Sequence, residues 1–138
     1  MNNLFCHLTN YAINKDHSDF QDNSSYQDEE GHKRSLSSVL STIEELGFDV
    51  NTLMNRIADM IVKTVIAGAP SITHVNRSCL PNDVENEMIF QVMGFDVMLD
   101  KKCRPWLLEV NHAPSFKTDS PLDYKIKKTL IVDTLKLL

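Results

Sequence analysis

The stretch GFDVMLDKKCRPWLLEVNHAPSF, residues 94–116, constrains the fold more than any other part of the chain. It contains two apolar runs on either side of a short basic segment, and this pattern predicts an antiparallel β-hairpin. If residues 101–104 form the turn, Asp100 lies opposite Pro105, and the other cross-strand pairs follow from that register. The sequence therefore predicts which side chains meet across the two strands.

Acidic and amide side chains interrupt both apolar runs. The predicted register sets Asp96 opposite Glu109 and Gly94 opposite Asn111. Because side chains alternate along a strand, Glu109 and Asn111 share a face, and we expect them to converge with Asp96. Two facing carboxylates repel each other unless a proton or a cation lies between them. Oxygen ligands of this kind suit Mg²⁺, and Gly94 leaves room for a ligand to approach the backbone.

An alternative stays open for this cluster: a half-exposed hairpin whose polar face happens to hold acids. Apolar neighbours favour the metal site, because they suggest that the acids do not lie on an open surface. These neighbours are Val97, Leu107, Leu108 and Val110.

Apolar residues at helical spacing predict two helices ahead of the hairpin. The first covers residues 36–46 and ends at Gly47, and the second covers residues 53–66 and ends near Gly68. Residues 69–87 contain two prolines and mixed polarity, which predicts an irregular connection.

A further helix is predicted at the end of the chain. Ser120 supplies a capping hydroxyl, Pro121 suits the first helical position, and Asp123 adds an acid to the first turn. With strands near 88–100 and 104–111, the fold class is α+β, with an antiparallel hairpin and flanking helices.

Composition excludes several classes of protein. The formal net charge of −5 argues against a generally cationic nucleic-acid binder, although a local basic patch is compatible with it. The three cysteines are odd in number and widely spaced, which favours free thiols in a reducing compartment over a disulfide framework or a zinc site. The start of the chain does not have the pattern of a signal peptide, and no apolar run is long enough to span a bilayer. We therefore expect neither a nucleic acid nor a membrane as partner.

Three blocks of the sequence resemble the tubulin tyrosine ligase-like family, and within it the polyglutamylase branch. They are HLTNYAINK (7–15), GFDVMLD (94–100) and PWLLEVNHAPSFKTDSPLD (105–123). The blocks come from both ends of the chain, in the family's order and at plausible separations, so the resemblance is specific.

The resemblance implies an ATP-grasp fold, in which ATP lies between two α+β lobes, and this chain is similar to the second half of that domain. It also implies a ligase in which ATP phosphorylates a protein carboxylate and the amino group of free glutamate attacks the acyl phosphate. Mg²⁺ would serve the phosphoryl transfer. The family's metal ligands match Asp96, Glu109 and Asn111.

Five further positions match the family's binding residues, and each has an ordinary structural alternative. Thr9 and Asn10 match a nucleotide-contacting pair, although both residue types also cap turns. Tyr11 matches a residue near the incoming glutamate, although tyrosine also fills cores. Lys33 matches a lysine that binds the carboxylate of the free amino acid; without the resemblance it reads as a solvated loop charge. His112 lies where the family contacts the acceptor protein, and otherwise reads as a loop residue.

The family's upstream lobe, with its phosphate-clamping lysines, has no counterpart in residues 1–138, so we expect a partial domain that is inactive alone. Either a fragment or a genuine short product fits. The resemblance names tubulin tails, microtubules and free glutamate as partners, in the cytoplasm and cytoskeleton, with a cilium or basal body as further locations. A non-catalytic tubulin-binding module, a glycine ligase and a ligase for a non-tubulin substrate stay open, as do the choice of α- or β-tubulin and of initiation or elongation.

Overall fold

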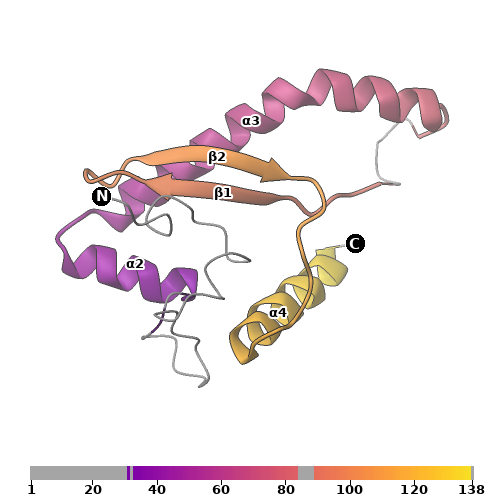
Figure 1. The fold of residues 1–138 in the computed structure, drawn as a ribbon. Coiled ribbons are helices and arrows are strands. Elements are labelled where there is room, and N and C mark those ends of the chain that lie inside the picture. Colours follow the sequence, from indigo (N-terminus) through magenta and orange to yellow (C-terminus); the bar gives the residue numbers. More distant parts are fainter. Residues whose placement is uncertain (1–30, 32, 84–88, 138) are drawn as a thin grey trace, which may run out of the picture. The chain divides into compact units, whose positions relative to one another are not determined.

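The computed structural model describes residue 31, residues 33–83 and residues 89–137. The elements follow one another as helix α2 (Leu36–Glu45), helix α3 (Val50–Cys79), strands β1 (Gly94–Leu99) and β2 (Pro105–Asn111), and helix α4 (Pro121–Leu137) (Figure 1). The predicted α+β class with an antiparallel hairpin is confirmed. The chain divides into two compact units: unit 1 comprises Met1–Thr42 and Phe116–Leu138, and unit 2 comprises Ile43–Ser115.

Helix α2 ends at the predicted glycine. The Phe48 amide donates to the Ile43 carbonyl at 3.2 Å and the Gly47 amide donates to the Glu44 carbonyl at 2.9 Å, which is the Schellman arrangement. Gly47 has a φ of 85°, a left-handed conformation that a residue with a Cβ atom rarely adopts. The helix stop at Gly47 is therefore set by local backbone geometry.

Helix α3 is longer than the sequence predicts. It starts behind the Asp49 cap, whose carboxylate accepts from the Thr52 amide at 3.1 Å, and it continues to Cys79. The predicted irregular connection over residues 69–87 is therefore wrong for its first part. Pro70 lies inside the helix, where it offers no amide hydrogen to the carbonyl of Ile66. A single proline costs a helix one hydrogen bond, and the long helical segments on both sides outweigh that loss here.

The hairpin is confirmed, but its register differs from the predicted one near the turn. Leu99, and not Asp100, lies opposite Pro105, and a β-bulge follows Asp96. The extra residue of the bulge is Leu108, because Val97 pairs with Leu107 while Asp96 pairs with Glu109. The bulge restores the predicted register for the outer half of the hairpin.

Asp100 accounts for the difference in register near the turn, because it belongs to the turn and not to β1. Its Oδ1 atom accepts from the Lys102 amide at 2.8 Å and from the Arg104 amide at 2.9 Å. The bond from the Arg104 amide contributes most to lowering the pKa of Asp100, and the bond from the Lys102 amide adds to it. Desolvation acts in the opposite direction but is outweighed. Asp100 is thus the first residue of the turn and no longer part of the strand, and Cys103 completes the turn at a φ of 57°.

In unit 2, α3 contacts β2, and an open groove of about 900 Å³ runs between the helix and the hairpin end. The groove is lined by Arg56, Asp59, Met60, Lys63, Thr64, Ala67, Arg104, Pro105 and Trp106.

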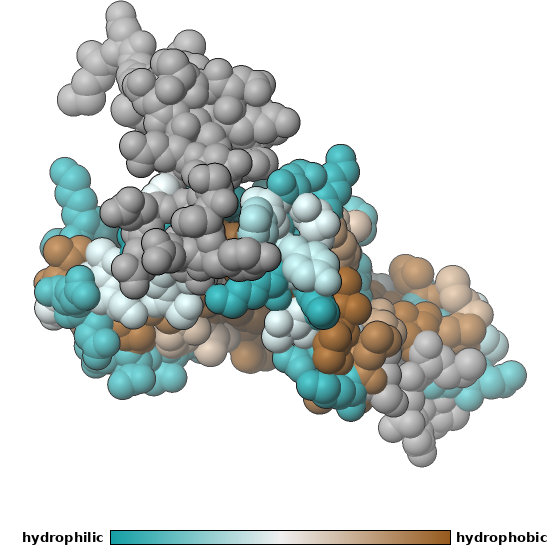
Figure 2. All heavy atoms as spheres, turned by 90° about the horizontal axis from the view of Figure 1, so that it is seen from below, coloured by the Kyte–Doolittle hydropathy of each residue, from teal (hydrophilic) through white to brown (hydrophobic). Residues whose placement is uncertain are grey.

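Few apolar side chains are buried. Among the residues that the structure describes, the buried large hydrophobics are Ile43, Leu53 and Leu122. Other members of the predicted apolar stripes are exposed, for example Leu46 at 70% and Ile66 at 65%. Brown patches on the visible face in Figure 2 show apolar side chains at the surface. Both predicted apolar segments are helical, but among the described residues most of their apolar side chains are not buried.

Two smaller expectations concern thiols and membranes. Cys79 and Cys103 are free thiols, as predicted, while Cys6 lies outside the described residues. Over the described ranges, none of the helices is both long and apolar enough to cross a bilayer.

Candidate functional site

The two predicted acids meet across the hairpin. Asp96 of β1 is paired with Glu109 of β2, and two residues further along Gly94 is paired with Asn111. Desolvation raises the pKa of Asp96, and the hydrogen bond and the negative charge of Glu109 raise it further. A cation between the two paired acids would remove the repulsion between their carboxylates.

Asn111 joins the acids from the same face of β2. Its Nδ2 atom donates to Glu109 Oε1 at 3.3 Å. Rotation of the amide by half a turn exchanges its nitrogen and oxygen, which would direct three oxygen ligands to one point. Two carboxylates and one amide oxygen form a hard-oxygen donor set that fits Mg²⁺, an ion that fills its remaining positions with water or phosphate oxygens.

The rest of the described structure holds no competing metal cluster. Within residues 33–83 and 89–137, no three His, Cys, Asp or Glu side chains are placed to bind one ion. The candidate site is therefore a pair of acids completed by an amide. Contrary to the sequence prediction, this face of the hairpin is open: Asp96 and Glu109 are exposed, and neighbouring Leu108 keeps 52% of its surface accessible.

Gly94 has a different role from the one that the sequence suggests. A Cβ atom at this position would lie 3.3 Å from the Cβ atom of Pro114 and 3.6 Å from that of Asn111. The space beside Gly94 is thus taken by the chain's own loop after β2. Glycine lets this loop approach β1 closely, and the approach fixes the backbone next to Asn111.

His112 follows directly in that loop and is exposed. Its carbonyl accepts a hydrogen bond of 2.6 Å from the side chain of Gln91, which precedes β1. Gln91 was not singled out in the sequence, because nothing in its neighbourhood marks a residue that bonds 21 positions away. It ties the segment carrying His112 to the start of the hairpin.

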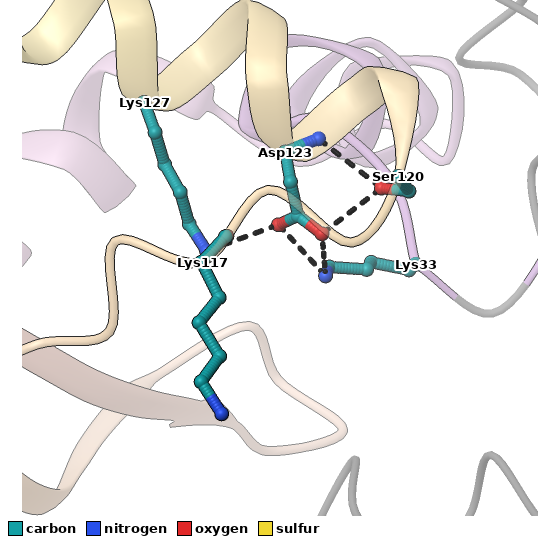
Figure 3. A network of polar contacts seen from close by, with 5 residues as sticks. All are labelled: Lys33, Lys117, Ser120, Asp123 and Lys127. Carbon is teal, nitrogen blue, oxygen red and sulfur yellow. Dashed lines mark hydrogen bonds and ion pairs between the residues drawn. The ribbon is translucent and has the colours of Figure 1, made fainter.

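Lys33 lies in unit 1, where it pairs with Asp123 of α4. The Lys33 ammonium donates to both carboxylate oxygens, at 2.8 Å to Oδ1 and 2.7 Å to Oδ2 (Figure 3). Lys127 approaches the same carboxylate, with its Nζ atom 3.4 Å from Oδ1. Asp123 was predicted only as an acid of the first helical turn, since a partner 90 residues away leaves no local signal.

The predicted start of α4 is confirmed, and its cap belongs to the same network. The Asp123 amide donates to Ser120 Oγ at 3.2 Å, and this hydroxyl donates to Asp123 Oδ2 at 3.0 Å. Desolvation raises the pKa of the buried Asp123 carboxyl, but the hydrogen bonds from Lys33 and Ser120 and the charges of Lys33 and Lys127 outweigh it and leave the pKa lowered. Asp123 is therefore a firmly ionised group.

Three candidate residues, Thr9, Asn10 and Tyr11, lie outside the described residues. Their proposed contacts with the nucleotide and with glutamate stay predictions. The structure brings together Asp96, Glu109 and Asn111 within unit 2, and it describes Lys33 separately within unit 1.

Comparison with known proteins gives a consistent result. The whole chain, residues 1–138, matches the Tubulin-tyrosine ligase family. It is 50% identical over 133 residues to a protein named probable beta-tubulin polyglutamylase from Tetrahymena thermophila, and the match covers 96% of this chain. It is 46% identical over 133 residues to tubulin polyglutamylase ttll6 of Danio rerio, again over 96% of this chain, and 44% identical over its full length to tubulin polyglutamylase TTLL6 of Homo sapiens.

The chain spans only a small part of these relatives. It covers 11% of the Tetrahymena protein, 16% of the Danio protein and 15% of the human protein.

Proposed function

The chain belongs to the tubulin-tyrosine ligase family, and on that premise we propose that it carries the metal-binding hairpin of a ligase that adds glutamate to tubulin. The reaction depends on ATP and Mg²⁺, and the chain corresponds to the second half of an ATP-grasp domain. The observation that supports this proposal most is the meeting of Asp96, Glu109 and Asn111 on one face of the hairpin. The names of the relatives, tubulin polyglutamylases, support the choice of substrate.

The proposed reaction has two steps. The terminal phosphoryl group of ATP passes to the carboxylate of an acceptor glutamate, which gives an acyl phosphate and ADP. The amino group of free glutamate then attacks the acyl carbon, an amide bond forms, and phosphate leaves. Mg²⁺, when bound, would neutralise the charge of the phosphates.

The residues of this chain serve these steps by binding and orientation. Asp96 and Glu109 would hold the cation, and the pairing of β1 with β2 keeps the two residues opposite each other. Lys33 binds the carboxylate of free glutamate, and His112, whose backbone is held by Gln91, contacts the acceptor chain. Thr9 and Asn10 contact the nucleotide, and Tyr11 lies near the incoming glutamate.

A ligation assay with variants tests the proposal. The full gene product is incubated with ATP, Mg²⁺, radiolabelled glutamate and tubulin, and label on tubulin is measured. The double variant Asp96→Asn with Glu109→Gln is expected to lose ligation by at least about a hundredfold, because the metal loses both charged ligands. Asp133→Asn is the matched control, since it removes an exposed acid of α4 whose partner is Lys136 at 2.9 Å.

The assay also separates the alternatives. A non-catalytic tubulin-binding module would pellet with microtubules but add no label in any form. Label from glycine in place of glutamate would indicate a glycine ligase, and label on another acidic protein would indicate a different substrate. We propose that the 138-residue chain alone does not ligate, and that the enzyme works on cytoskeletal microtubules, in the cytoplasm or in a cilium or basal body.

A further inference from the structure

We propose that Asp123 is a positioning residue that holds the Lys33 ammonium where it meets the carboxylate of the free amino acid, an inference that rests on the proposed function. A lysine side chain has four flexible methylene groups and a compact charge, so by itself it does not define a position. A ligand pocket that depends on such a lysine needs a second group to fix it.

Asp123 is the second group that fixes the Lys33 side chain. The Lys33 ammonium contacts both oxygens of Asp123, at 2.8 and 2.7 Å, so the nitrogen is centred on the carboxylate (Figure 3). The Asp123 side chain keeps 7% of its surface exposed, whereas Lys33 keeps 32%. Asp123, which anchors the pair, is therefore buried, whereas the Lys33 side chain is partly exposed.

The anchor is itself held in place by its own helix. Ser120 Oγ donates to Asp123 Oδ2 at 3.0 Å, and Lys127 lies 3.4 Å from Oδ1. Lys127 is braced in turn by a hydrogen bond to the carbonyl of Lys117 (Figure 3). These contacts fix the Asp123 rotamer, so the first turn of α4 determines where the Lys33 nitrogen lies.

Asp123 interacts with two ammonium groups and not with Lys33 alone. Asp123 divides its single negative charge between the ammonium groups of Lys33 and Lys127. Under the proposed function, the ligand carboxylate meets a Lys33 ammonium that Asp123 has already oriented. Lys33 and Asp123 both belong to unit 1, so the arrangement does not depend on the placement of the hairpin.

The test uses steady-state kinetics of the full gene product with tubulin, ATP and free glutamate. Asp123→Asn is expected to raise the KM for glutamate about tenfold or more, the usual size for a lost charge-assisted contact. The KM for ATP should stay unchanged, because the substitution leaves the phosphate and metal contacts intact. Asp123→Glu keeps the charge and should recover much of the glutamate KM, which also covers the case that Asp123→Asn does not fold. Asp133→Asn, on the same helix, should behave like the unsubstituted protein.

A charge swap separates positioning from a merely structural ion pair. Lys33→Asp combined with Asp123→Lys keeps an ion pair between the two positions but moves the ammonium into the helix. The inference expects that the swap recovers thermal stability while the glutamate KM stays raised. A swap that restores the glutamate KM, or an Asp123→Asn protein with an unchanged glutamate KM, would overturn the inference alone. Absence of ligation by the unsubstituted protein would overturn the proposed function and this inference together.

Discussion

Asp96 and Glu109 are the two residues on which the functional account depends. Like charges placed directly opposite each other in an antiparallel pair destabilise the hairpin. The pKa of Asp96 is raised first by desolvation and then by the hydrogen bond and the negative charge of Glu109, and only the last of these causes is the repulsion between the two acids. A pair that costs stability in the absence of a ligand is typical of a binding site.

Asp96→Asn should therefore make the hairpin more stable and the metal site weaker. We expect that Mg²⁺ raises the melting temperature of the unsubstituted gene product, because the ion binds the folded state, and that this rise disappears in Asp96→Asn. Differential scanning fluorimetry with and without Mg²⁺ measures both effects. Asp133→Asn serves as control, and an undiminished rise in Asp96→Asn would show that the acids do not bind the ion.

The acid cluster was predictable from the sequence because it depends on two local rules, strand alternation and hairpin register. These rules bring Asp96, Glu109 and Asn111 to one face of the hairpin, because the longer turn and the Leu108 bulge leave the register at the site unchanged. The partner of Lys33 could not be found by the same means, since Asp123 is 90 residues away and its own position already explains an acid at a helix start. Contacts between segments that are far apart in the sequence can be identified only once the three-dimensional structure is known.

At the scale of elements, the hairpin shows why the predicted register was right at the site and wrong at the turn. Asp100 caps the turn with its carboxylate and so lengthens the turn by one residue. Leu108 bulges from β2 and compensates for that residue before Glu109 is reached. The longer turn and the bulge each shift the register by one residue in opposite directions, so Asp96 still lies opposite Glu109.

Two single-residue deletions test this account of the hairpin. Deletion of Leu108 removes the bulge but leaves Glu109 opposite Asp96, so Mg²⁺-dependent ligation should be largely kept. Deletion of Val110 moves Asn111 to the other face of β2 and should reduce ligation strongly, by about tenfold or more if one ligand is lost. Ligation assays on both variants provide the comparison, and equal losses in the two would argue against the register as the basis of the site.

Helix α4 gives a prediction about pH. The pKa of Asp123 is lowered in the folded chain, since the contacts with Lys33, Ser120 and Lys127 outweigh desolvation. A lowered pKa stabilises the fold above the ordinary value of 3.8, and this contribution is lost as the pH falls through the folded-state pKa. Hydrogen exchange of the Asp123 and Tyr124 amides should accelerate over that acid range, after correction for the intrinsic rate. In Asp123→Asn this additional dependence should be missing, and its persistence there would assign it to another group.

The end of helix α3 could not be predicted from local sequence patterns. Gly68 and Pro70 are strong breakers, and they led to a predicted end near Gly68, yet the helix continues to Cys79. Breakers act on one or two hydrogen bonds, while the helical preference of a 30-residue segment is summed over its whole length. The caps at Gly47 and Ser120 were predictable because each is decided by a few neighbouring atoms.

At the scale of the whole chain, the exposed apolar surface is the main feature. The buried large hydrophobics among the described residues are limited to Ile43, Leu53 and Leu122. Apolar side chains along α3 and α4 remain accessible, including Val62 at 54% and Leu135 at 65%. The apolar pattern correctly indicated helices, but periodicity does not tell which surface covers a helix face.

The isolated 138-residue chain should therefore unfold with little cooperativity and bind a hydrophobic dye. The buried apolar surface of the described residues is too small to offset the conformational entropy that is lost when those residues become ordered. Urea unfolding and anilinonaphthalene sulfonate fluorescence of the isolated chain and of the full gene product measure the difference. A sharp unfolding transition of the isolated chain without dye binding would contradict this expectation.

The most direct measurement is the Mg²⁺ dependence of glutamate ligation to tubulin by the full gene product and its Glu109→Gln variant. If the hairpin holds the ion, the variant needs at least about tenfold more Mg²⁺ for half-maximal rate, because a charged ligand has become a neutral one. The Asp133→Asn control should need the same concentration as the unsubstituted protein. Ligation by Glu109→Gln with an unchanged Mg²⁺ requirement would contradict the assignment of Asp96, Glu109 and Asn111 as the metal site.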